Sequence, residues 1–283
     1  MSRLPFALVA VLPLAAQTLT LRSEFLRADP RGGILDSDAT PQPRELLSPA
    51  VVRNGFASFH LVIESERGNY FLFAGSNPAN VFGIAVYREN FARSGEDWIP
   101  DALTPVKLPE FGVIPDPQAA IPGQTTRAYL LDVWVPPDAP VGRVRLEVQM
   151  KAGGWTIWPM EVRILPARVP ELRYRSPEPL PEAALRADES AKAPLVDYLG
   201  QHGEGPDTRQ EKSLSRPSQD APRSLREVIR RNAEQDMALA RGLDPKVLVP
   251  ELKGKVSAAG GGEWYLGIRD LIYRLSAAAV RER

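Results

Sequence analysis

The sequence predicts a mainly β protein: an antiparallel two-sheet, immunoglobulin-like sandwich, followed by a proline-rich linker and two C-terminal α-helices. Three observations lead to this fold class. Between residues 18 and 165, apolar and polar residues alternate in short runs separated by turn formers. Nine of the 28 prolines fall in residues 166–222. Two segments near the C-terminus place their apolar residues at helical spacing.

Residues 1–16 have the pattern of a Sec-type signal peptide. Arg3 is followed by an uncharged apolar run that ends in small residues at Ala16. The run is shorter than the ~20 residues that a membrane-spanning helix requires, and Pro5 and Pro13 disfavour a helix. We therefore expect cleavage near Ala16, a secreted or periplasmic protein, and no transmembrane segment in the mature chain.

The sandwich domain is assigned to residues 17–165. In 143–150 the alternation is clearest, because the even-numbered residues are apolar and the odd-numbered ones are polar or charged. The predicted strands are 18–26, 57–64, 69–74, 81–87, 127–135, 143–150 and 155–164. Short strands with turns and no helices between them indicate two packed antiparallel sheets.

Two segments follow the predicted sandwich. Residues 166–222 are predicted to be a linker, because they hold too little apolar surface to offset the entropy of ordering. Residues 223–283 are predicted to be helical. Ser224 and Glu227 form a capping-box pattern before a helix over 225–241, and a second helix covers 263–281. Their apolar faces require a partner surface, which is each other, the sandwich or another protein.

The composition excludes several kinds of chemistry. Without cysteine, the chain forms no disulfide and no Cys-based zinc site. His60 and His202 are the only histidines, which leaves little material for a His-based zinc site or a Ser-His-Asp triad, and we expect no cofactor or metal. His60 is predicted to be an outward or edge residue of strand 57–64 rather than a catalytic base. The balanced charge gives no indication of a nucleic-acid partner.

Asp97 and Asp101 are candidate binding residues. They belong to the densest acidic cluster of the β region, which also contains Glu89, Glu96 and Asp116. A pair of carboxylates is what glycoside hydrolysis requires, so this cluster is the candidate source of such a pair. A solvated surface loop has the same composition, and we predict that the cluster is a loop.

Trp98 and Trp155 are the other candidate binding residues. Exposed aromatic rings provide apolar faces on which sugar rings stack, although most aromatic side chains are buried. Trp155 and Trp158 have opposite parity on strand 155–164, so one of them should point away from the core. Trp134 ends an apolar strand and is predicted to lie in the core.

Three segments in order carry a family resemblance: Val86-Tyr-Arg-Glu, Trp98-Ile-Pro-Asp-Ala-Leu-Thr-Pro, and Asp132-Val-Trp-Val-Pro-Pro-Asp-Ala-Pro-Val-Gly leading into 143–148. Together they resemble the N-terminal β-sandwich of secreted bacterial proteins related to glycoside hydrolase family 123 and to the domain of unknown function 4091. The sequence departs from the family pattern at Val141, where proline is usual, and at Arg143, where threonine or tyrosine is usual.

The resemblance implies a sandwich domain of a glycan-processing protein. It transfers no catalytic residue, because catalysis in such proteins lies in a following barrel of about 250 residues, whereas about 120 residues follow position 165 here.

These observations predict an exported, non-catalytic protein that binds a glycan or protein surface. The expected partner is a polysaccharide or another envelope protein. Two alternatives stay open: a glycoside hydrolase-related enzyme that uses a carboxylate pair, and a structural component of an envelope assembly.

Overall fold

The computed structural model describes residues 17–24, 26–33, 48–94, 96–170, 173–175, 211–213, 224–258 and 263–283. The predicted signal peptide and most of the predicted linker, His202 included, lie outside these residues. Within the linker, β11 (Arg173–Arg175) pairs antiparallel with β12 (Glu211–Ser213).

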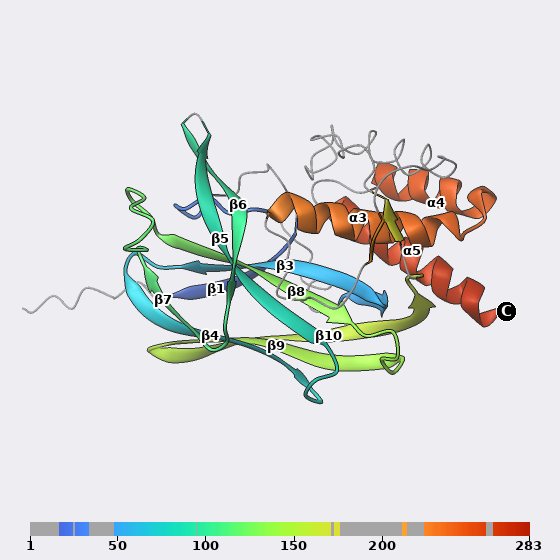
Figure 1. Ribbon diagram of the computed structural model, residues 1–283, viewed down its shortest axis with the longest axis horizontal. Helices are drawn as coiled ribbons and strands as arrows, with labels where there is room; N and C mark the ends of the chain where they lie inside the picture. Colours follow the sequence, from blue (N-terminus) through green and yellow to red (C-terminus); the bar gives the residue numbers. More distant parts are fainter. Residues whose placement is uncertain are drawn as a thin grey trace, which may run out of the picture.

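Two five-stranded sheets form the body of the molecule and stack as two layers (Figure 1). The first sheet contains, in spatial order, β1 (Thr18–Ser23), β3 (Gly55–Glu64), β8 (Thr126–Val135), β5 (Gly83–Ser94) and β6 (Asp97–Val106). The second contains β2 (Ala50–Arg53), β10 (Gly154–Arg168), β9 (Gly142–Ala152), β4 (Gly68–Asn77) and β7 (Glu110–Ile114). All neighbours are antiparallel except β2 and β10, which are parallel. The predicted fold class, mainly β with a sandwich, is confirmed.

The main core lies between the two sheets. On β9 the even-numbered residues from Val144 to Met150 are buried, and the odd-numbered ones face outward, as the alternation predicts. Inside the core the hydroxyl oxygens of Tyr70 and Tyr129 lie 2.7 Å apart, so each satisfies the other's polar group. Gly112 on β7 permits this arrangement, because any side chain there would overlap the Tyr70 ring.

Three strands of the two large sheets and the placement of Trp134 differ from the predictions. The short strand β2, the strand β6 and the short strand β7 were not expected. The prediction that Trp134 lies in the core is wrong: it is half-buried, on the opposite face of β8 from the core residues Val133 and Val135.

In the described part of the chain, three helices follow the sheets, where two were predicted. α3 (Leu225–Arg241) begins at the predicted capping box: the Glu227 backbone N–H donates to the Ser224 hydroxyl (3.3 Å), and the Ser224 N–H donates to the Glu227 carboxylate (3.0 Å). α5 (Glu263–Arg281) has the predicted bounds. The additional helix is α4 (Pro245–Ala258). It was not predicted, because Pro250 lies inside it and its apolar residues do not gather on one face.

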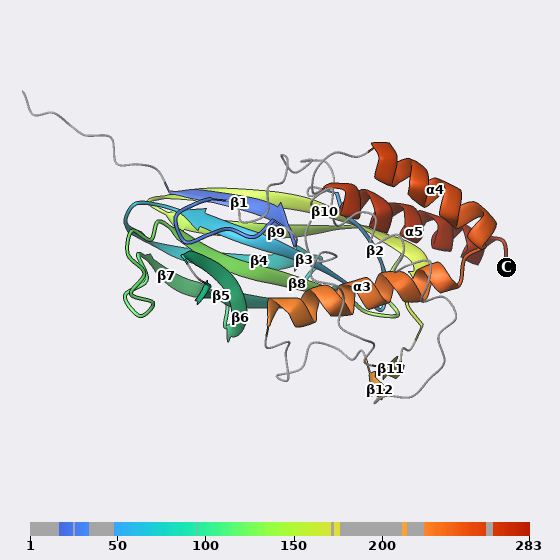
Figure 2. The same cartoon turned by 90° about the horizontal axis from the view of Figure 1, so that it is seen from above.

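The helices dock on the sandwich of their own chain and form a third layer at one end of the molecule (Figure 2). α3 lies against β3 and β6, while α5 lies against β10 and β2. A second apolar core fills this interface, with Leu130 and Tyr87 from the first sheet against Val228 and Ile272 from the helices. Because both faces of the first sheet are covered, nine of the ten residues of β3 are buried.

Candidate functional site

The four predicted site residues lie on two different sheets. Asp97, Trp98 and Asp101 lie on β6, which is an edge strand of the first sheet, whereas Trp155 lies on β10 in the second sheet. Asp97, Asp101 and Trp155 are exposed, and Trp98 is half-buried. The prediction of a loop around Asp97 and Asp101 is wrong, because this segment pairs with β5.

Asp97 and Asp101 do not form a carboxylate pair of the kind that glycoside hydrolysis uses. Asp97 and Asp101 are four residues apart on one strand, which separates them by about 13 Å. Hydrolytic pairs are about 5 to 10 Å apart. Glu89 is buried and contacts His60, and Asp116 forms an ion pair with Arg127.

His60 lies in the interior, so the prediction of an outward or edge position is wrong. The His60 side chain is fully buried because the C-terminal helices and the residues after β1 cover this face of the sheet. Its Nδ1 lies 2.6 Å from the Glu89 Oε1 and its Nε2 lies 2.8 Å from the Glu24 backbone oxygen. Burial alone would lower the pKa of His60, but the Glu89 carboxylate and these hydrogen bonds raise it above 6.5.

Further buried polar groups join His60 in a polar layer between the first sheet and the helices. Asp132 on β8 accepts hydrogen bonds from Ser58 Oγ (2.7 Å) and from both terminal nitrogens of Arg231 on α3 (2.9 and 2.7 Å). Asn232 donates to the Glu24 carboxylate (2.5 Å) and to Ser58 Oγ (3.0 Å). The contacts of Arg231 and Asn232 join the sandwich to α3.

Arg269 completes the polar layer from α5. It donates to the Glu24 carboxylate (2.6 Å) and to Asp236 on α3 (3.1 Å), and Tyr273 also donates to Asp236 (2.8 Å). Burial raises the pKa of Glu24, while Arg269 and Asn232 act in the opposite direction. Since these groups are buried and bonded to one another, the polar layer holds the helices in place and presents no accessible catalytic group.

The outward face of the second sheet carries an aromatic platform, which consists of Phe71, Phe73, Phe111, Trp155 and Ile157. Phe71, Phe111, Trp155 and Ile157 are between 43 and 55% exposed. The three aromatic residues among them are the only aromatic side chains of the described chain that are largely exposed. An exposed apolar patch of this kind is a candidate interaction site, because large exposed apolar patches are uncommon on monomeric proteins.

Strand register explains how these residues come together. Phe111 on β7 pairs with Phe71 on β4, Phe71 pairs with Lys151 on β9, and Lys151 pairs with Trp155 on β10. These four residues therefore form one row across four neighbouring strands, with a span of about 14 Å. The Phe71 and Phe111 ring centroids are 5.2 Å apart, and those of Phe73 and Trp155 are 5.6 Å apart. The row is longer than a single sugar ring.

Polar groups flank the aromatic platform. Gln149 on β9 donates to Glu147 (2.7 Å), which also forms an ion pair with Arg145. Amide, carboxylate and guanidinium groups beside apolar rings supply the directional hydrogen bonds that a stacked polar ligand requires.

Only one platform residue, Trp155, was predicted as a site residue. Phe71 and Phe73 lie on a predicted strand whose other face carries Tyr70 and Leu72. Residues 70–73 are therefore apolar on both faces of their strand, whereas the outward face of the predicted strand 143–150 is polar or charged. This difference is a signal in the sequence that could have identified Phe71 and Phe73 as exposed aromatic residues. Phe111 lies on β7, a strand that was not predicted.

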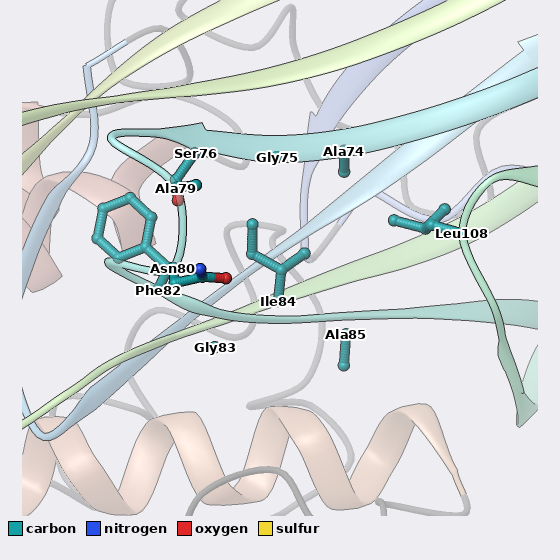
Figure 3. A pocket seen from close by; sticks show the side chains of 10 residues that line it. All are labelled: Ala74, Gly75, Ser76, Ala79, Asn80, Phe82, Gly83, Ile84, Ala85 and Leu108. Carbon is teal, nitrogen blue, oxygen red and sulfur yellow. The ribbon is translucent and has the colours of Figure 1, made fainter.

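A cavity of about 430 Å³ opens at the edge of the sandwich, between β4 and β5 (Figure 3). Ala74 and Ile84 point into it from opposite strands, and Phe82 and Leu108 contribute to its apolar walls. None of its lining residues is acidic, basic or nucleophilic except Ser76, so the cavity supplies no acid–base pair.

Neither a metal centre nor a membrane span is found within the described ranges. No group of three or more His, Asp or Glu side chains there is arranged to hold a metal ion. None of the described helices is long and apolar enough to span a bilayer.

Comparison with known proteins finds no matching family model and no matching curated protein. Among solved structures, the chain is similar to a family 123 glycoside hydrolase from Clostridium perfringens, with 10% identity and a TM-score of 0.37; the match covers 55% of this chain and 28% of that chain. It is also similar to the C-terminal domain of the antigen I/II-family protein AspA of Streptococcus pyogenes, with 11% identity, a TM-score of 0.26 and coverage of 54% and 53%. Scores of this size assign no family.

Proposed function

We propose that this protein is an exported, non-catalytic binding protein, and that its aromatic platform binds a glycan. The observation that carries the proposal is the row of Phe111, Phe71 and Trp155, whose rings are open to solvent on the outward face of the second sheet. The C–H groups on one face of a pyranose ring form an apolar surface that packs on an aromatic ring, while its hydroxyl groups remain free to bond polar neighbours.

Two further observations support a glycan over other ligands. A row of open rings across four strands suits an extended chain of sugars better than a compact small molecule, which usually binds in a pocket. The sequence also resembles the sandwich domains of proteins related to glycoside hydrolase family 123, which process glycans.

The test is binding of the mature protein to a panel of immobilised polysaccharides. We expect Trp155→Ala to weaken binding by about 30-fold, because truncation of a central aromatic contact costs about 2 kcal/mol. Trp98→Ala is the matched control, since it removes the same side chain from a different sheet, and it should change the affinity by less than about twofold. Asp97→Ala and Asp101→Ala should also leave the affinity unchanged.

Two results would count against the proposal. Binding that depends on Trp98 and not on Trp155 would move the site to the β5–β6 hairpin. If the protein binds none of the polysaccharides tested, the proposal that its ligand is a glycan is contradicted.

Export is tested separately. If residues 1–16 are a signal peptide, N-terminal sequencing of the protein from the extracytoplasmic fraction should begin near Gln17. A mature chain that begins at Met1 in that fraction would contradict cleavage.

A further inference from the structure

Lys151 occupies the centre of the aromatic row. It lies on β9, with Phe71 as its cross-strand neighbour on β4 and Trp155 as its neighbour on β10. Its ammonium nitrogen is 5.5 Å from the centroid of the Trp155 ring. A ligand that stacks on Trp155 or Phe71 therefore places its substituents beside this ammonium group.

The other charges on this face are paired. Arg145 forms an ion pair with Glu147, and Arg143 forms one with Glu161 (3.2 Å). At the rim, Arg163 on β10 pairs with Asp270 (3.3 Å).

Lys151 differs from these residues. In the part of the chain that the structure describes, no carboxylate forms an ion pair with it. The centre of the aromatic platform therefore carries one positive charge that its own neighbours do not neutralise. The ring of Trp155 stabilises this charge without cancelling it, because a cation–π contact leaves the ammonium N–H groups able to donate to an anion.

We propose that the aromatic platform selects an acidic polysaccharide, in which a uronic acid ring stacks on Trp155 or Phe71 and its carboxylate accepts a hydrogen bond from Lys151. This inference rests on the proposed glycan-binding function and specifies its ligand class. A charge-assisted hydrogen bond is stronger than a neutral one, and its electrostatic part increases when the stacked ring excludes water.

The experiment compares two forms of one polymer with the mature protein. Polygalacturonate is tested beside the same polymer after chemical reduction of its carboxyl groups, so that the pair differs only in the anionic group. Wild type should bind polygalacturonate at least about tenfold more tightly, which corresponds to one favourable charge-assisted contact. The preference should weaken as salt is raised.

Variants at Lys151 connect the preference to this residue. Lys151→Gln should bind both polymers equally and lose the salt dependence, whereas Lys151→Arg should keep the preference because the charge remains. Unchanged urea unfolding of both variants serves as the control for folding, since the side chain is exposed.

The possible failures are distinct. Equal binding of both polymers that still depends on Trp155 would overturn the acidic ligand and leave the glycan-binding function intact. A Lys151-dependent preference for a polymer of neutral sugars that carries sulfate esters, with no preference for polygalacturonate, would overturn the assignment of a uronic acid as the ligand. Binding to none of these polymers, nor to the wider panel, would overturn the proposed function itself.

Discussion

Arg269→Met should lower the free energy of unfolding by about 3 to 5 kcal/mol. The Arg269 guanidinium is almost fully buried and contacts both Glu24 (2.6 Å) and Asp236 (3.1 Å), which are themselves buried. Methionine fills a similar volume but leaves two carboxylates without this cation. Removing one partner of a buried ion pair costs this much because the remaining charge cannot be solvated. Chemical denaturation followed by tryptophan fluorescence measures the loss.

Arg274→Met on the same helix is the matched control. Arg274 is half exposed and pairs with Asp270 at a distance of 2.9 Å, one helical turn away. The same substitution there should cost less than about 1 kcal/mol, because water replaces a surface ion pair at little cost. Equal losses in the two variants would mean that the polar layer contributes no more than an ordinary surface contact.

The loss in Arg269→Met should also appear as undocking of the helices. Glu24 follows the first strand of the sandwich, whereas Arg269 lies 245 residues later on α5. Their contact therefore joins the two ends of the described chain. The substitution should accelerate amide hydrogen exchange, relative to wild type, more in α3 and α5 than in β9, because β9 lies in the sheet remote from the polar layer.

The sequence alone predicts those parts of the fold that depend on local pattern. Strand β9 alternates cleanly because one face meets the core and the other meets water, and the Ser224 capping box marks the start of α3 to the residue. Each of these two signals is contained in a few consecutive residues, so no knowledge of distant contacts is needed to recognise it.

Long-range contacts explain the errors. On β3 the polar residues Ser58 and His60 alternate with apolar ones, which is also the pattern of a solvent-facing edge. Their actual surroundings include Asp132 and Asn232, which are 74 and 174 residues away from Ser58. A polar residue that faces water and one that faces a buried polar partner have the same local sequence, so pattern alone cannot separate them.

The candidate site shows the same limit. The parity of Trp155 and Trp158 correctly predicts that one of them faces outward, because parity is a local property. That Trp155 stands in one row with Lys151, Phe71 and Phe111 depends on the register of four strands. Register is set by the whole sheet, so the row becomes visible only in the folded structure.

The largest pH effect is expected from His60. Both of its ring nitrogens lie beside acceptors, which are the Glu89 carboxylate and the Glu24 backbone oxygen. Each ring nitrogen must carry a proton in order to donate to its acceptor. We therefore expect His60 to be an imidazolium paired with Glu89 when the pH is below its raised folded-state pKa. The positively charged Arg27 acts against this charge, but the net effect of its surroundings is a raised pKa.

The direction of the pH effect follows from this raised pKa. The unfolded chain releases the His60 proton near pH 6.5, whereas the folded protein holds it to higher pH. The stability from this pair is complete below pH 6.5 and is lost as the pH rises through the folded pKa. Glu234, whose pKa burial raises to about 8, adds a slope of the same sign. The His60 contribution is therefore the difference between wild type and His60→Gln, measured by urea unfolding at pH 6 to 9.

His60→Leu should destabilise the protein by about 3 kcal/mol at pH 6, because Glu89 then remains buried without its partner. The double variant His60→Leu with Glu89→Leu should recover most of this loss, since two apolar side chains can replace a buried ion pair at little cost. His202→Gln is the control, because it removes the chain's other histidine and should leave the pH dependence unchanged. A double variant as unstable as the single one, with the pH slope of wild type, would show that the pair is not ionised and that His60 acts only through its shape.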